Sequence, residues 1–156
     1  MTPWKIPPVI KVYEALGAID DNRIEVRGDS AKVYSSSRGK SYDVIYDAEK
    51  NAITSNDNGS FFQGYLGYPA ITYLLKVGVF EYDVNIAESF GGFAWKDINV
   101  KFKNDWAKTE TYIFEHIIKQ GWNSQVLREA AQDILKQIEL LELNRLPSSQ
   151  KPPKAY

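Results

Sequence analysis

The chain has no cysteine and only one histidine among its 156 residues. Without cysteine it cannot form disulfides, present a thiol nucleophile or build a cysteine zinc cage. With a single histidine it cannot form a site that needs two imidazole groups. No apolar run is long enough to span a membrane, and no basic-then-apolar leader opens the chain. We therefore expect a cytoplasmic protein with no membrane contact, no cofactor and no bound metal.

A strong charge of either sign is also lacking. The sequence holds 19 Lys and Arg residues against 20 Asp and Glu residues, a net charge of −1. No global field therefore favours nucleic acid or a membrane. The chain length suits one domain with one hydrophobic core. We expect a single domain over residues 1–146 and a mobile tail, rich in Ser, Pro and Lys, over residues 147–156.

Helical periodicity is present in four places. It predicts a first helix that begins after Pro7–Pro8 and stops at Gly17, and a short apolar helix that begins at Pro69. Two C-terminal helices are predicted to begin near Asn104 and Asn123, because asparagine is a good N-cap residue.

The period changes to two between residues 20 and 56, which predicts three or four short strands in an antiparallel meander. The same alternation predicts strands over residues 80–86 and 98–102. The expected fold class is α+β. It consists of an antiparallel sheet with an N-terminal helix, a short central helix and two C-terminal helices packed on one face.

Two loops, residues 55–68 and 87–96, are dense in glycine and aromatic residues. Glycine lets a ligand approach the backbone closely, and flat rings can stack on a base, a sugar or another protein. The alternative is that both loops fold inward and cap the core. The candidate binding residues are Phe61, Phe62, Tyr65, Tyr68, Phe93 and Trp95.

Residues 22–46 carry a surplus of two positive charges, with tyrosines between them. Such a face could contact phosphates and stack on bases, although exposed strands also carry Lys and Arg to remain soluble. This hairpin is the alternative site, for nucleic acid. Its candidate residues are Arg27, Lys32, Tyr34, Arg38, Lys40 and Tyr42.

The last predicted helix, residues 124–146, has an apolar stripe with spacings of four and three. Leu135, Leu140 and Leu143 lie off this stripe. The helix is therefore either surrounded by its own domain or in contact with another chain. This pattern predicts a protein partner, or a homo-oligomer, that is bound through residues 124–146.

The sequence holds no complete catalytic constellation. His116 is the one imidazole that could act as a base, and it lies opposite the apolar stripe of its helix. We therefore favour a non-enzymatic binding or adaptor protein over a nucleic-acid-binding protein. A third alternative is a small-molecule enzyme with carboxylates in a cleft between the two aromatic loops. It predicts at least one deeply buried Asp or Glu, with a raised pKa, beside a concave pocket.

Residues 31–37 (AKVYSSS) and 40–44 (KSYDV), followed by an extended segment, a glycine-containing loop and a short apolar helix, resemble a SWIM zinc-finger domain. In that family two pairs of Cys and His ligands hold zinc. The corresponding positions here fall near Ser55, Asp57, Gly67 and Pro69, which are not a zinc ligand set. The resemblance implies a metal-free ββα unit over residues 31–77 that contacts DNA or protein, with aromatic packing in place of the ion.

Overall fold

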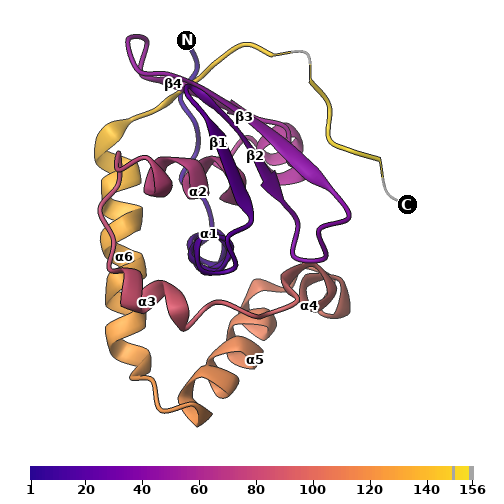
Figure 1. Cartoon of the computed structure of the whole chain (residues 1–156), viewed down its shortest axis with the longest axis vertical. Coiled ribbons are helices and arrows are strands. Elements are labelled where there is room, and N and C mark those ends of the chain that lie inside the picture. Colours follow the sequence, from indigo (N-terminus) through magenta and orange to yellow (C-terminus); the bar gives the residue numbers. More distant parts are fainter. Residues whose placement is uncertain (149, 155–156) are drawn as a thin grey trace.

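The computed structural model describes residues 1–148 and 150–154. Figure 1 shows the sheet at one end of the molecule, α1 and α2 beneath it, and α6 along one side. The elements follow in the order α1 (Val9–Asp20), β1 (Ile24–Arg27), β2 (Ser30–Tyr34), β3 (Ser41–Asp47), β4 (Ala52–Ser55), the π-helical turn η1 (Gly59–Gln63), α2 (Tyr68–Lys76), α3 (Val84–Glu88), α4 (Trp95–Lys101), α5 (Trp106–Lys119), α6 (Ser124–Leu141) and β5 (Asn144–Arg145).

Strands β1 to β4 form the antiparallel meander that the period-two pattern predicts. Val44 at its centre pairs with Ala31 of β2 and with Ser55 of β4, and all three side chains are buried. Strand β5 then pairs with β4 in parallel, which gives five strands in the part of the chain that the structure describes. The sheet is therefore mixed rather than purely antiparallel, because α6 returns the chain to the edge of β4. The α+β class is confirmed.

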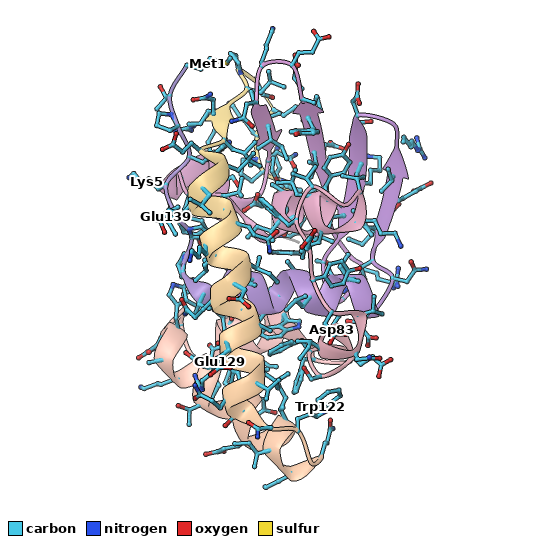
Figure 2. The ribbon with its side chains drawn as sticks, turned by 90° about the vertical axis from the view of Figure 1, so that its left-hand side faces the viewer. Met1, Lys5, Asp83, Trp122, Glu129 and Glu139 are labelled. Atoms are coloured by element: carbon cyan, nitrogen blue, oxygen red, sulfur yellow. The ribbon has the colours of Figure 1, made fainter. Side chains whose placement is uncertain are left out.

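Helix α2 lies against strands β1 to β4, and α1 packs on α2. Helix α6 in turn crosses α1, as Figure 2 shows from the side, with Glu129 and Glu139 on its exposed side. The expectation that both C-terminal helices cover the sheet is corrected by this arrangement. The sheet face is occupied by α2, which is apolar over most of its length, so α6 packs chiefly on α1 and α5 packs on α6.

Two predicted strands are short helices instead. Residues 80–83 are irregular, and residues 84–86 begin α3, where the Asp83 carboxylate accepts a hydrogen bond from Asn85 N at 2.9 Å. Residues 98–102 end α4, whose first turn is fixed by a hydrogen bond from Lys96 N to Ser36 Oγ at 3.0 Å. An apolar alternation this short fits either structure, and the capping contacts decide it here.

Helix α6 ends at Leu141 rather than continuing to residue 146. Glu142 has φ 50°, in the left-handed region, which stops the helix. Asn144 N then donates to Asn51 O at 2.9 Å, which places the following residues in the sheet.

Part of the predicted tail is described. Lys151 O accepts a hydrogen bond from Asn56 Nδ2 at 3.2 Å. Ser149 and residues 155–156 lie outside the described residues. The mobility of residues 147–156 and the single domain over residues 1–146 stay predictions. Across residues 1–148 and 150–154, no helix combines the length and the apolar character needed to cross a membrane.

Helix α1 is the centre of the helical layer, with eight of its twelve residues buried. The ring of Tyr13 stacks on Phe90 with a centroid distance of 4.8 Å and meets the edge of Phe114 at 5.2 Å. Gly17 lies within this helix instead of ending it. A β-carbon at Gly17 would lie 2.6 Å from Phe90 O and 2.7 Å from Trp95 Nε1, so the missing side chain lets the segment that leads into α4 approach α1.

We predict that Gly17→Ala destabilises the protein. Alanine would ordinarily stabilise a helix interior by about 0.5–1 kcal/mol relative to glycine. Here the added methyl group must displace backbone as well as a buried indole, which costs about 1–3 kcal/mol. Urea denaturation should therefore show a lower free energy of unfolding than for the wild type. An unchanged or higher value would show that the contact between α1 and the 90–95 segment is not tight.

Candidate functional site

A cavity of about 730 Å³ opens where the end of the sheet meets α1, the η1 loop and α4. It has the size of a small-molecule site. The lining mixes charged, amide, hydroxyl and aromatic side chains. Its residues are Lys11, Glu14, Arg23, Ser35, Ser36, Lys40, Tyr42, Asp57, Asn58, Gly59, Phe62, Gln63, Tyr65, Tyr68, Trp95, Lys96, Asn99, Val100, Asn104 and Trp106.

The two aromatic loops meet at this cavity. Four of the six candidate binding residues line it: Phe62, Tyr65, Tyr68 and Trp95. The other two, Phe61 and Phe93, are not in the lining. Phe61 meets Phe62 edge to face at 4.9 Å, and Phe93 lies 5.7 Å from the Trp95 ring.

A buried ion pair and an amide form one wall. Lys11 Nζ lies 2.9 Å from Glu14 Oε2, and Asn99 Nδ2 donates to Glu14 Oε1 at 2.5 Å. Glu14 is 3% exposed and Asn99 is 9% exposed. Asn99 Oδ1 is buried and accepts no hydrogen bond from any described residue. A buried acceptor without a donor is rare in native proteins.

The charge of Glu14 keeps Lys11 protonated. Desolvation alone would lower the pKa of the Lys11 ammonium, but the charge and hydrogen bond of Glu14, helped by Tyr65 and Asp57, raise that pKa above its ordinary value. The ammonium also lies over the Trp106 ring, 4.4 Å from its centroid, in a cation–π contact.

Asp57 holds the opposite loop in place. Its carboxylate accepts hydrogen bonds from the hydroxyls of Ser55 and Ser60, each at 2.7 Å, and from Ser60 N at 3.1 Å. Gly67 packs directly on this carboxylate, because a β-carbon there would lie 2.1 Å from Asp57 Oδ2. These contacts fix the η1 turn and so position Phe62 and Tyr65 at the cavity.

The positions that the SWIM resemblance assigns to metal ligands partly converge. Ser55, Asp57 and Gly67 are neighbours in the network that Asp57 holds together. No cluster of three or more His, Asp or Glu side chains suited to a metal ion occurs among residues 1–148 and 150–154. Membership of the SWIM family stays a prediction. Here the loop is held by hydrogen bonds to the Asp57 carboxylate and by aromatic packing between Phe61 and Phe62.

Two tyrosines of the lining, Tyr65 and Tyr68, keep their protons at neutral pH. Burial, the main cause, raises the pKa of both the Tyr65 and the Tyr68 hydroxyls, in Tyr68 well above its ordinary value. Both hydroxyls can therefore donate hydrogen bonds. The Tyr68 ring meets the edge of Tyr42 at 6.0 Å, which extends the aromatic surface to the sheet.

Arg23 brings a buried cation to the sheet end of the cavity. It is 2% exposed. Its Nη1 donates to Tyr34 O at 2.7 Å, and its Nε lies 3.4 Å from Asp21 Oδ2. A guanidinium stays charged in proteins, so Arg23 is a permanent cation at this end of the cavity, and Asp21 is its partner.

The candidate nucleic-acid residues do not form one basic face. Arg27 Nη2 donates to Glu25 Oε1 at 3.0 Å, and Tyr34 Oη donates to Glu25 Oε2 at 3.1 Å. Lys32 Nζ donates to Asp43 Oδ1 at 3.1 Å. Acidic neighbours therefore offset the charge of this hairpin.

The remaining hairpin residues point elsewhere. Arg38 Nη2 donates to Asp21 O at 3.0 Å, whereas Lys40 and Tyr42 line the cavity. His116 is exposed and does not line the cavity, and its Nδ1 lies 2.9 Å from Tyr112 O.

Three leucines lie off the apolar stripe of the last predicted helix, and two of them pack within the domain. Leu143 is buried and Leu135 packs against the core, whereas Leu140 is 73% exposed. Val126 is the other large apolar side chain exposed on α6, fourteen positions before Leu140. The two therefore do not form a continuous patch. Association through residues 124–146 stays a prediction.

Sequence reasoning missed Lys11, Glu14, Arg23, Asn99 and Trp106 as site residues. The sequence did contain a signal for Lys11 and Glu14. A helix that is apolar around most of its circumference is buried, so its few charged residues must be buried with it. In the α1 sequence VIKVYEALGAID, Lys11 and Glu14 are three residues apart and can form a pair. Asn99 carried no such signal, because its segment was expected to be a strand.

We predict that Lys11→Met lowers the free energy of unfolding at pH 7 by about 3 kcal/mol, because it leaves the Glu14 carboxylate buried without its counter-charge. Adding Glu14→Gln should recover much of this loss. The control is Lys50→Met, which removes an exposed pair of the same spacing, Lys50 with Asp47, and should change stability little. Chemical denaturation of the four proteins measures these values.

The pH dependence has a definite sign. The pKa of Lys11 is raised on folding, so its contribution is fully present below its ordinary pKa of 10.5. It is lost as pH rises through the raised value. The stability difference between wild type and Lys11→Met should therefore shrink above pH 10.5. If Lys11→Met costs no more than Lys50→Met at pH 7, the ion pair is not a buried element of the cavity wall.

No curated protein and no solved structure matches the chain. A family model described as "Uncharacterised conserved protein UCP014422" matches residues 4–144. The match covers α1, strands β1 to β4 and α6, and it includes each lining residue of the cavity. With nearly the whole chain matched, the protein belongs to the family of uncharacterised conserved proteins UCP014422.

Proposed function

We propose that this protein binds a small polar molecule in the 730 Å³ cavity. The observation that carries the proposal is Asn99 Oδ1, a buried acceptor that lacks a donor, in a residue that lines the cavity. Leaving such a group unsatisfied costs about 1–3 kcal/mol. A ligand N–H or O–H that reaches it would recover that cost and gain affinity from the same contact.

The rigid setting of this acceptor supports the proposal. Asn99 is held by its hydrogen bond to Glu14, and α4 is held against the sheet by the hydrogen bond between Lys96 N and Ser36 Oγ. The Asp57 network fixes the facing loop. Sites with preorganised polar groups bind more tightly, because less side-chain motion is lost on binding.

The cavity also has the geometry that the enzyme alternative requires, a buried acid beside a concave pocket between the aromatic loops. Glu14, however, is engaged by both Lys11 and Asn99. A general base needs a carboxylate that can reach the substrate proton. We therefore propose binding and assign no bond-making step to Glu14. Binding of nucleic acid is less well supported, because acidic side chains pair with hairpin cations.

A thermal-shift screen of polar small molecules tests the proposal. Compounds that bind in the cavity should raise the melting temperature of the wild type, and Asn99→Leu should abolish or strongly reduce the shift. Asn85→Leu, at an exposed position outside the lining, is the matched control and should respond as the wild type does. The melting temperatures of the wild type and of both variants are also measured without ligand.

A second variant tests the proposal independently in case Asn99→Leu folds poorly. Phe62 lines the cavity but is 67% exposed, so Phe62→Ala should leave the fold intact and weaken binding. Compounds that bind both variants as tightly as they bind the wild type would place the site elsewhere and contradict the proposal.

A further inference from the structure

The charged side chains of the α1 wall and of the η1 loop are satisfied within the protein. Lys11 Nζ lies 2.9 Å from Glu14 Oε2. The Asp57 carboxylate accepts hydrogen bonds from the hydroxyls of Ser55 and Ser60, each at 2.7 Å. Neither side of the cavity therefore presents a charge that needs an ion from a ligand.

The cations nearer the sheet also have partners. Arg23 Nε lies 3.4 Å from Asp21 Oδ2. Lys40 and Lys96 each have a partner as well. An ionic ligand would have to break one of these interactions or enter the cavity without a counter-charge, and a buried charge without a partner is strongly unfavourable. The lining therefore disfavours an ion.

Uncharged polar groups of the lining, by contrast, lack partners among the described residues. Asn99 Oδ1 is a buried acceptor without a donor, and Trp95 Nε1 is a buried donor without an acceptor. The hydroxyls of Tyr65 and Tyr68 form no hydrogen bond with any described residue either. Because a phenol can both donate and accept, the unmet hydrogen bonds of this site are neutral and of both kinds.

The identity of the unpaired Asn99 atom follows from its neighbour. A carboxylate only accepts hydrogen bonds, so Glu14 Oε1 must face the amide nitrogen of Asn99, which lies 2.5 Å away. The amide oxygen is then the atom that is left without a donor. The site therefore requires an N–H or O–H group from its ligand at this position.

Trp95 and Asn99 lie on one face of α4, because residues four apart in a helix are neighbours. Both contact α1. Asn99 donates to Glu14, and a β-carbon at Gly17 would lie 2.7 Å from Trp95 Nε1. Since Glu14 and Gly17 are three residues apart in α1, the unpaired acceptor and the unpaired donor follow one seam between α1 and α4. Glu14, Trp95 and Asn99 all line the cavity, so the seam borders it.

The two tyrosine hydroxyls lie within electrostatic reach of the same α1 wall. Burial is the main cause of the raised pKa of Tyr65 and of Tyr68, and the charges of Glu14 and Asp57 add to it in both. The hydroxyls therefore keep their protons at neutral pH. The rings of these tyrosines also give the cavity flat apolar surfaces, on which the ring of a ligand can lie.

We propose that the ligand of this cavity is an uncharged ring compound that carries both hydrogen-bond donors and acceptors, either a sugar or a heterocyclic amide. Its polar groups meet Asn99 Oδ1, Trp95 Nε1 and the two tyrosine hydroxyls, and its ring lies against the aromatic side chains. Both seam atoms are buried in the free protein, so the ligand reaches them through side-chain adjustments of the kind that commonly accompany binding. This assignment rests on the proposed binding function and adds to it the charge and the chemical class of the ligand.

Matched pairs of probes that differ in charge test the class. Nicotinamide against nicotinate tests a heterocyclic amide, and glucose against glucuronate tests a sugar; the second compound of each pair is an anion at neutral pH. Isothermal titration calorimetry should show that the neutral member of at least one pair binds, and about tenfold or more tightly than its anion. Raising the salt concentration should leave binding of the neutral compound unchanged.

Tyr65→Phe and Tyr68→Phe test the contacts. Each substitution removes only a hydroxyl and should weaken binding of the neutral probe by roughly three- to tenfold, which corresponds to one lost hydrogen bond. Tyr82→Phe is the matched control, because Tyr82 is half-buried like the other two but lies outside the lining. Since neither target hydroxyl has a protein partner, both variants should melt at the wild-type temperature without ligand, so weaker binding would not reflect a folding defect.

An anion that binds as tightly as its neutral counterpart, or salt that weakens the neutral probe, would overturn the uncharged class. The cavity would remain the site if Asn99→Leu still weakened that binding. Neutral probes that bind to Tyr65→Phe and Tyr68→Phe as to the wild type would overturn the assigned contacts.

If no probe binds, the Asn99-dependent compounds of the thermal-shift screen decide the class. Uncharged ring compounds among them would support the assignment, and ions alone would overturn it. A screen without any Asn99-dependent compound would overturn the proposed function itself.

Discussion

The structure depends on how one buried helix neutralises its own charge. Helix α1 is enclosed by α2, α3 and α6, so the Glu14 side chain is almost completely buried. Lys11 supplies the counter-charge and the Asn99 amide of α4 supplies a hydrogen bond. An unpaired buried charge would cost several kcal/mol, so α4 must dock where Asn99 can reach Glu14. That docking also leaves Asn99 Oδ1 buried without a donor, in a residue that lines the cavity.

The cavity lies between two sides of the molecule that are anchored separately and do not close on each other. The sheet end is held to α4 by Ser36, and the η1 loop is held by Asp57, so each side has its own anchor. Gly17 and Gly67 remove the side chains that would push these anchors apart. Between them remains a space with polar walls and aromatic sides. Polar groups that are fixed in this way favour a ligand over collapse of the space.

The meander and the long C-terminal helices were predictable, because periodicity reports which face of an element is buried. The helices α3 and α4 were not, since Asp83 and Ser36 decide them through individual hydrogen bonds. Glycine and ring density marked the aromatic loops as candidate binding surfaces, and four of their rings line the cavity. The polar wall was not recognised. Lys11 and Glu14 meet Asn99 only when their two helices pack together, and Glu14 and Asn99 are 85 residues apart in sequence.

Proton–nitrogen NMR of the side-chain N–H groups tests the account most directly. The four tryptophans mark different places: Trp95 and Trp106 line the cavity, Trp4 lines a separate hollow near α6, and Trp122 follows α5. On titration with a compound from the thermal-shift screen whose effect depends on Asn99, the Trp95, Trp106 and Asn99 signals should shift, and those of Trp4 and Trp122 should stay in place. Shifts confined to Trp4 or Trp122 would show that the cavity is not the binding site.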